Sequence, residues 1–148
     1  MKQIVYFFLF SITFGNAQVK GHHYEEGDGR KITQIELERA KALYNKMVTS
    51  DDVIEKNKLI NRLLLIVNKQ SYPQNFLASE ENINDQKIQT WVDKNVLPKR
   101  RKKATKLLSR LVLLKNKIET ENSEIIEIFK YKANLDQIQE IHKSKIER

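Results

Sequence analysis

The sequence predicts an all-α protein, a bundle of four to five helices in which the last two form an antiparallel hairpin. Three observations support this prediction. After Gly29 the chain contains no glycine, and its two prolines, Pro73 and Pro98, lie between segments whose apolar residues recur at helical spacing. No alternation of apolar and polar residues is long enough to indicate a sheet. The length of 148 residues fits one domain.

The start of the chain is predicted to be a cleaved signal peptide. Lys2 precedes an apolar run from Ile4 to Phe14, and Gly15 and Ala17 stand at positions −3 and −1 of a cleavage site. These eleven residues are too few for a membrane-spanning helix, which needs about 20 residues. We expect the protein to be exported to a bacterial periplasm or to the extracellular space. The alternative is an uncleaved anchor or a buried core helix.

Three parts of the chain follow from this prediction. Residues 1–17 form the signal peptide, residues 18–30 a flexible polar leader, and residues 31–148 a single helical domain. The chain has no cysteine, which excludes disulfides, Cys-ligated zinc, iron–sulfur clusters and thiol nucleophiles. No later apolar run approaches 18 residues, so we expect no membrane span in the mature chain.

The first helix is predicted over Thr33–Val48. Thr33 and Glu36 form a T-x-x-E capping box, in which each side chain satisfies a backbone N–H group of the other residue. Ile32 and Leu37 stand at the positions of a hydrophobic staple, which fixes the direction in which the chain enters the helix.

The second helix is predicted over Asp51–Lys69, with Ser50 as its N-cap. Its second half, Leu63–Val67, is apolar on every side, which is typical of a central, buried helix. A loop is predicted from Pro73 to Ala78. The third helix is predicted over Glu80–Val96, capped by Ser79.

The fourth helix is predicted to begin at Pro98, because proline suits the first position of a helix. Its apolar residues are spaced by three and four, as in a heptad seam: Ala104, Leu107, Leu111, Leu114 and Ile118. A fifth helix is predicted to begin at Ser123. The two helices could instead form one rod of 50 residues, about 75 Å long, but the polar stretch 119–123 favours a turn.

The positive charge is concentrated in one segment. Residues 94–117 contain ten basic residues and no acidic residue, which exceeds the net charge of +8 for the whole chain. Lys99–Lys103 occupy the first turns of the fourth helix, where the helix dipole already places positive charge. Local preferences are most often broken at functional sites, so we interpret this segment as a binding surface.

The predicted hairpin would bring the end of the fifth helix beside the start of the fourth. The candidate binding residues are therefore Lys99, Arg100, Arg101, Lys102, Lys103, Lys106, Arg110, Lys143 and Lys145. We expect these cations to gather at one end of the molecule and to dock an anionic partner. The alternative is a solvated face that is partly paired with acidic residues of the first three helices.

The expected partner is an anionic envelope component: an acidic lipid, a glycan or an acidic protein surface. Nucleic acid is disfavoured because no aromatic residues interleave with the basic run to stack on bases. Insertion of the fourth helix into a membrane surface is disfavoured as well, because the core needs its apolar stripe Leu107–Ile118.

No residue pattern predicts catalysis, a cofactor or a metal site. His22 and His23 lie in the leader without neighbours that would orient their rings for metal binding. The carboxylate pairs Asp51/Asp52 and Glu80/Glu81 are explained by helix capping and the helix dipole. The sequence contains no G-x-S-x-G, H-E-x-x-H, P-loop or dinucleotide fingerprint.

We therefore predict an exported, non-enzymatic binding protein that uses its basic patch on residues 94–117. Two alternatives stay open. A small, basic, exported helical protein also fits a holdase-like periplasmic chaperone, and a hydrolase built on two carboxylates would escape the motif tests. The sequence leaves the native ligand and the oligomeric state open.

Overall fold

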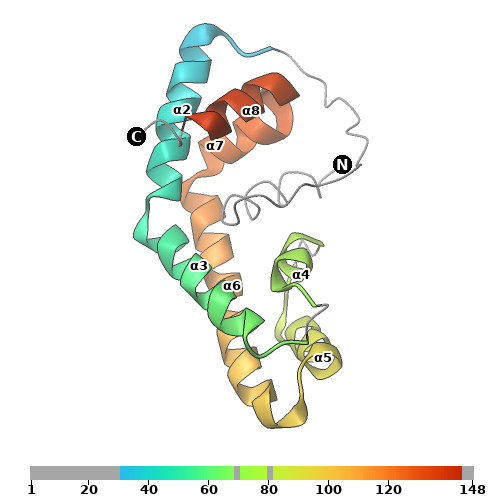
Figure 1. The fold of residues 1–148 in the computed structure, drawn as a ribbon. Coiled ribbons are helices and arrows are strands. Elements are labelled where there is room, and N and C mark those ends of the chain that lie inside the picture. Colours follow the sequence, from blue (N-terminus) through green and yellow to red (C-terminus); the bar gives the residue numbers. More distant parts are fainter. Residues whose placement is uncertain (1–30, 69–70, 80–81, 145–148) are drawn as a thin grey trace.

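The computed structural model describes residues 31–68, 71–79 and 82–144, and the predictions made for residues 1–30 lie outside this part (Figure 1). The described chain is all-helical, as predicted, and its one β contact is an isolated bridge between Val67 and Val96. No helix in this part is long and apolar enough to cross a membrane. The elements are α2 (Gln34–Val48), α3 (Asp51–Leu64), α4 (Pro73–Ser79), α5 (Asp85–Asn95), the 3₁₀ turn η1 (Pro98–Arg100), α6 (Arg101–Glu121), α7 (Ser123–Glu127), the π-helical turn η2 (Ile128–Lys132) and α8 (Leu135–Lys143).

The first two helices begin where their capping residues predict. The Thr33 hydroxyl accepts a hydrogen bond from the Glu36 N–H (3.3 Å), and the Glu36 carboxylate accepts one from the Thr33 N–H (2.8 Å). The Ser50 hydroxyl accepts the N–H of Val53 at 3.4 Å. Local side-chain chemistry therefore fixes both helix starts.

Helix α3 ends at Leu64, five residues earlier than predicted. The chain then turns, and Leu65 is 79% exposed, so the prediction of a buried helix through Lys69 is wrong. Ile66 and Val67 pack against the core from a non-helical segment, held by the bridge between Val67 and Val96. A short, wholly apolar run does not distinguish a buried helix from a buried extended segment.

The predicted loop after Pro73 is helix α4, in which Pro73 takes the first helical position. The third predicted helix begins later than expected. Helix α5 starts at Asp85, because the Asn84 side chain accepts the Lys87 N–H at 2.9 Å and caps the helix. Asn84 therefore takes the capping role assigned to Ser79.

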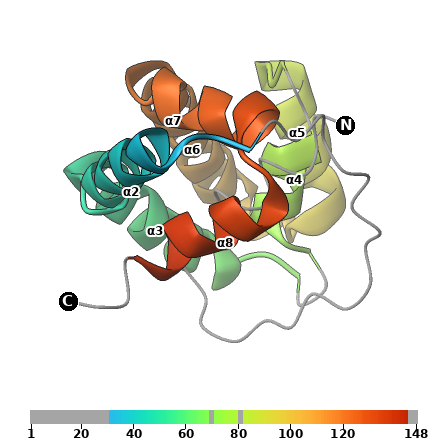
Figure 2. The same ribbon diagram turned by 90° about the horizontal axis from the view of Figure 1, so that it is seen from above.

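Helix α6 packs antiparallel to α3. Lys117 binds Asp52 (2.7 Å) near one end of the pair, and Arg100 donates to the Leu65 carbonyl (3.4 Å) at the other. Figure 2 shows α6 between α2 on one side and α4 and α5 on the other. The antiparallel neighbour of the basic helix is thus α3, and the predicted hairpin with the C-terminal helix is wrong.

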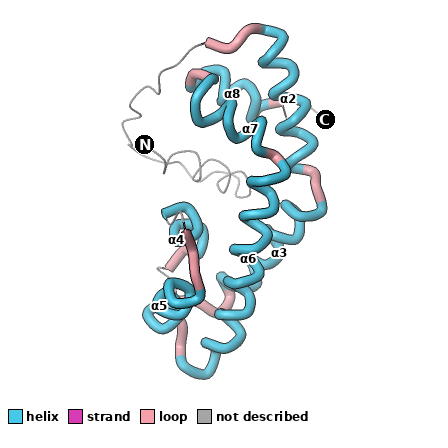
Figure 3. Tube along the Cα trace, turned by 180° about the vertical axis from the view of Figure 1, so that it is seen from behind, coloured by secondary structure: helices cyan, strands magenta, loops and turns pink. Residues whose placement is uncertain are grey.

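The C-terminal segment lies against α2 instead. The predicted fifth helix is interrupted after η2, and Asn134 and Gln137 form a new capping box that starts α8. Gln137 also bonds the backbone N–H and C=O of Ile32 (3.0 and 2.8 Å). Figures 1 and 3 show α8 beside α2, at the end of the molecule opposite to α5. Asn is at least as good an N-cap as Thr, but Asn134 lies within a segment that the sequence analysis interpreted as one continuous helix, so this helix start was missed.

The buried side chains form two hydrophobic clusters. One lies between α4, α5 and the adjoining halves of α3 and α6, and includes Leu63 and Leu111. The other lies between α2, α7, η2 and α8, and includes Tyr44 and Ile141. Helices α3 and α6 contribute to both clusters and join them. The start of α6 thereby lies at the α5 end of the molecule.

Candidate functional site

The basic segment, residues 94–117, runs from the end of α5 through η1 into α6. Pro98 opens η1, which contains Lys99 and Arg100, and α6 then begins at Arg101. No side chain caps the first N–H groups of α6, and no acidic residue lies in its first turn. The positive end of the helix dipole therefore adds to the side-chain charge at this point.

Two of the predicted binding residues are engaged within the fold. Arg101 pairs with Asp93 of α5 (3.1 Å) and donates to the carbonyls of Asp93 (2.9 Å) and Val96 (3.1 Å). Arg110 holds Glu55 of α3 through two guanidinium nitrogens, at 2.9 and 3.1 Å. Both arginines attach α6 to neighbouring helices through acidic residues, so for these two residues the structure agrees with the alternative of a partly paired face.

The last two basic residues of the segment, Lys115 and Lys117, are paired as well. Lys115 is buried and lies 3.4 Å from Glu119, and Lys117 lies 2.7 Å from Asp52. The acidic partners outside α6 come from α3 and α5. Their contribution depends on how the helices pack, which the local sequence does not reveal.

The remaining predicted residues form the basic surface, which we define as Lys99, Arg100, Lys102, Lys103 and Lys106. All five side chains are exposed, and within the described residues none makes an ion pair with a carboxylate. The structure thus gathers five of the nine predicted cations at the start of α6. Lys94 of α5 is also exposed near this point.

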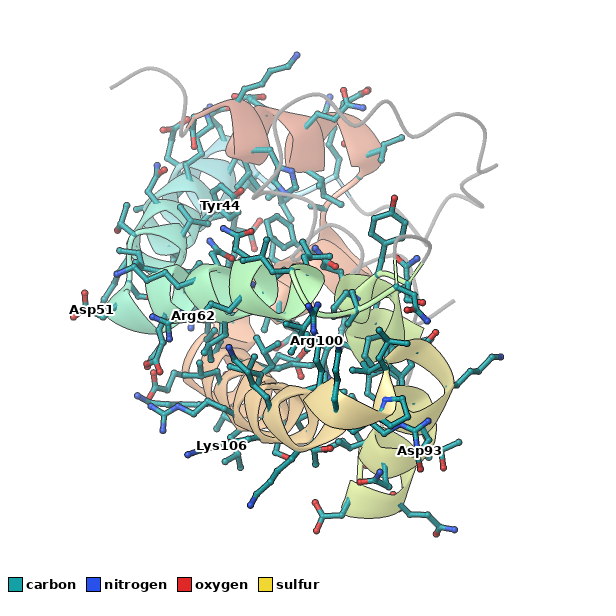
Figure 4. The ribbon with its side chains drawn as sticks, turned by 60° about the horizontal axis from the view of Figure 1, so that its bottom comes forward. Tyr44, Asp51, Arg62, Asp93, Arg100 and Lys106 are labelled. Atoms are coloured by element: carbon teal, nitrogen blue, oxygen red, sulfur yellow. The ribbon has the colours of Figure 1, made fainter. Side chains whose placement is uncertain are left out.

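Helix α3 adds two basic residues that the sequence analysis did not single out. Lys58 and Arg62 are exposed and one helical turn apart. The antiparallel register of α3 and α6, in which Glu55 meets Arg110 and Leu65 meets Arg100, places them alongside the basic surface. Figure 4 shows Arg62, Arg100 and Lys106 with the α3–α6 pair. The spacing of Lys58 and Arg62 was visible in the sequence, but their proximity to α6 was not.

The structure separates Lys143 from this surface. His142, its neighbour, stacks on Tyr44 of α2 at 5.0 Å, in the cluster that also contains Ile118. Ile118 lies 17 residues along α6 from Arg101, about 25 Å at the helical rise. Lys143 therefore lies at the far end of α6, and Lys145 lies outside the described residues.

Perturbed titratable groups occur elsewhere in the molecule. Burial lowers the pKa of His142 from 6.5 to about 4 and the pKa of Lys56 from 10.5 to about 8. Burial also raises the pKa of Tyr44. Across residues 31–68, 71–79 and 82–144, no three His, Cys, Asp or Glu side chains are grouped to hold a metal ion. The most pronounced electrostatic feature at the surface is the charge at the start of α6.

Comparison of the chain with models of protein families, with curated proteins and with solved structures gives no match. The function is therefore argued from the chemistry of the molecule itself.

Proposed function

We propose that the protein is an exported, non-enzymatic binding protein that docks an anionic partner through the basic surface. One observation carries the proposal. The five cations at the start of α6 are exposed without acidic partners among the described residues, whereas Arg101, Arg110, Lys115 and Lys117 are all paired.

The charge distribution is unfavourable for the isolated molecule. Each exposed cation in the first turn of a helix opposes the dipole by a few tenths of a kcal/mol, and neighbouring cations repel one another. An anion bound there would relieve both effects and would also interact with Lys58 and Arg62 of α3. A surface of one sign also attracts an oppositely charged partner over about one Debye length.

Export is part of the proposal because of the amino-terminal sequence. Lys2, the apolar run from Ile4 to Phe14 and the small residues Gly15 and Ala17 support it. In an envelope or extracellular space, the available polyanions are acidic lipids, glycans and acidic proteins.

Heparin tests the electrostatic part of the proposal, because it is a soluble, densely sulfated polyanion. The test variant replaces Lys99, Arg100, Lys102, Lys103 and Lys106 with Gln. The matched control replaces five exposed cations elsewhere, again four lysines and one arginine, with Gln: Lys31, Arg39, Lys46, Lys132 and Lys143. Both variants have the same net charge, so any difference between them reports the position of the charge.

We expect the wild-type affinity for heparin, measured by titration calorimetry, to fall steeply with salt. The test variant should reduce the slope of log Kd against log salt by about four, because each lost phosphate-like contact removes about 0.7–0.9 of slope. The control should retain most of the slope. Equal losses in the two variants, with unchanged far-UV circular dichroism, would show that net charge alone governs binding and would contradict the proposal.

A further inference from the structure

Three exposed apolar residues lie on neighbouring segments beside the basic surface. Leu65 is 79% exposed, Leu97 is 53% exposed and Tyr72 is 55% exposed. Single exposed apolar residues are ordinary on a protein surface, but a group of them indicates an interaction. The other exposed large apolar residues in the described chain, Ile35, Ile54, Leu113, Tyr131 and Leu135, belong to other elements.

Backbone contacts bring together the segments that carry these residues. The segment after α3 runs beside the segment after α5, through the bridge between Val67 and Val96 and the bond from Asn68 N–H to the Asn95 carbonyl (3.0 Å). Leu65 precedes the first segment and Leu97 ends the second. We call this place the junction, defined by residues 65–68, 71–72 and 95–100.

Two side-chain hydrogen bonds also connect the segments of the junction. The Ser71 hydroxyl, next to Tyr72, donates to the Asn95 side chain at 2.6 Å. The Arg100 guanidinium donates to the Leu65 carbonyl at 3.4 Å. A member of the basic surface thus contacts the backbone of an exposed leucine, and Lys99 follows Leu97 by two residues. Apolar and cationic groups therefore share one end of the molecule.

This combination distinguishes between the possible anionic partners. A glycan would neutralise the cations and leave Leu65 and Leu97 in water, and an acidic protein face would cover them only if it carried a matching apolar patch beside its carboxylates. A membrane surface with anionic lipids offers phosphates for the cations and an apolar boundary for the leucines. Tyrosine also favours this boundary, because its ring is apolar and its hydroxyl remains hydrated.

The anchoring residues are not those of the α6 stripe. Leu108, Leu111 and Leu114 are buried in the core, so this face of α6 is already covered. The junction differs because Leu65, Leu97 and Tyr72 are exposed. Leu65 follows the end of α3, Leu97 follows the end of α5 and Tyr72 precedes α4, so these residues can reach a surface without unfolding the molecule.

We propose that the anionic partner is the surface of a membrane containing acidic lipids. The basic surface contacts the lipid phosphates, and Leu65, Leu97 and Tyr72 enter the headgroup boundary. This inference rests on the proposed function, because it names the partner of the same surface. It does not require a membrane-spanning segment.

Vesicle sedimentation separates the apolar contribution from the charge contribution. The probes are vesicles of phosphatidylcholine alone and vesicles with about 30 mol% phosphatidylglycerol. The apolar test variant is Leu65→Ser/Leu97→Ser, and its control is Ile35→Ser/Leu113→Ser, which alters two equally exposed apolar residues elsewhere. All variants are made in the full chain, so differences between them do not arise from residues 1–30.

We expect the wild type to prefer the anionic vesicles. The Leu65→Ser/Leu97→Ser variant should bind them at least about tenfold more weakly, because two leucines lose partial burial, while its control stays within about twofold of the wild type. Heparin binding should be unchanged in both, because all charges are retained. The five-Gln variant of the basic surface should bind both heparin and anionic vesicles much more weakly than its matched control does.

A site-specific label reports the depth of the junction directly. The chain has no cysteine, so Leu97→Cys and Ile35→Cys each provide one position for an environment-sensitive fluorophore. With anionic vesicles, the label at position 97 should shift its emission to the blue and gain intensity. The label at position 35 should change little.

The outcomes separate the two proposals. If heparin binding depends on the basic surface but the label at position 97 does not respond to vesicles, the membrane inference is wrong and the proposed function stands, with a glycan or acidic protein as partner. An equal loss of anionic-vesicle binding in Leu65→Ser/Leu97→Ser and in its control Ile35→Ser/Leu113→Ser would also overturn the inference. If the five-Gln variant behaves as its matched control does towards both probes, both proposals fail.

Discussion

At the scale of single residues, His142 shows how burial decides protonation. Its ring stacks on Tyr44 (5.0 Å) and meets the edge of Phe129 (5.4 Å). These rings exclude water, which disfavours the imidazolium and lowers the pKa of His142 to about 4. The histidine therefore serves the packing of α8 on α2.

We predict that His142 makes the protein less stable as the pH falls. The unfolded chain binds its proton below pH 6.5, and the folded protein does so only near pH 4, so the unfolded state binds more protons in between. The free energy of unfolding, measured with urea, should drop by about 2 kcal/mol across this window from this group.

The variant His142→Phe isolates this effect, because phenylalanine retains the aromatic packing and does not titrate. Its free energy of unfolding should approach or exceed that of the wild type as the pH falls from about 7 to about 4.5. Subtracting the two pH profiles removes the carboxylates, which titrate in both proteins. A parallel decline of the two profiles would show that the buried histidine is not the cause.

At the scale of the element, the first turn of α6 contains cations that oppose the helix dipole and lower the stability of the helix. Lys102 and Lys103 are exposed in its first turn, where carboxylates are preferred. We predict that Lys102→Glu/Lys103→Glu raises the free energy of unfolding by about 1 kcal/mol, because it removes two unfavourable charges and adds two favourable ones. The same variant should weaken heparin binding, measured by calorimetry, by more than tenfold.

The control reverses a charge at the C-terminal end of a helix. Lys143 lies in the last turn of α8, where a cation complements the dipole. Lys143→Glu should therefore lower stability slightly and leave heparin binding within about twofold. If Lys102→Glu/Lys103→Glu loses stability instead, the cations at the start of α6 have stabilising partners that the ion pairs do not reveal.

Helix starts were predictable where a capping residue directly preceded an expected helix. Thr33 and Ser50 marked α2 and α3 correctly, whereas Asn84 and Asn134, which cap as well as Ser, lay inside segments expected to be continuous helix and were missed. The charge concentration of α6 was also visible in the sequence. Its pairing with Glu55 and Asp93 was not, because those acids reach α6 only through the packing of α3 and α5. Periodicity shows that a helix has an apolar face but not which helix covers it.

At the scale of the whole molecule, α3 and α6 span two hydrophobic clusters. Along α3, Val53 belongs to the cluster with α8 and Leu59 to the cluster with α5. Between them lies Lys56, which is only 4% exposed. Along α6, Lys115 lies between Leu114 of one cluster and Ile118 of the other, and it is 3% exposed. A polar layer with Glu119 thus divides the interior.

Replacement of Lys56 tests whether this layer costs stability. Burial lowers the pKa of Lys56 to about 8, and the charge of Glu119 offsets only part of that effect. The folded protein therefore still holds a buried ammonium at pH 7. We predict that Lys56→Met raises the free energy of unfolding at pH 7 by about 1 kcal/mol, because methionine fills a similar volume without a charge and would join the two clusters.

The pH dependence and a second variant complete this prediction. Between pH 8 and 10.5 the unfolded chain retains the Lys56 proton that the folded protein has lost, so this group gives the wild type added stability as the pH rises, and the advantage of Lys56→Met should shrink towards about pH 10. Lys115→Met should instead lower stability, because it removes the cation 3.4 Å from Glu119. Urea unfolding at about pH 7 and about pH 10 measures both. A lower free energy of unfolding for Lys56→Met at pH 7 would contradict the prediction and would show that the buried lysine stabilises the contact between the two clusters.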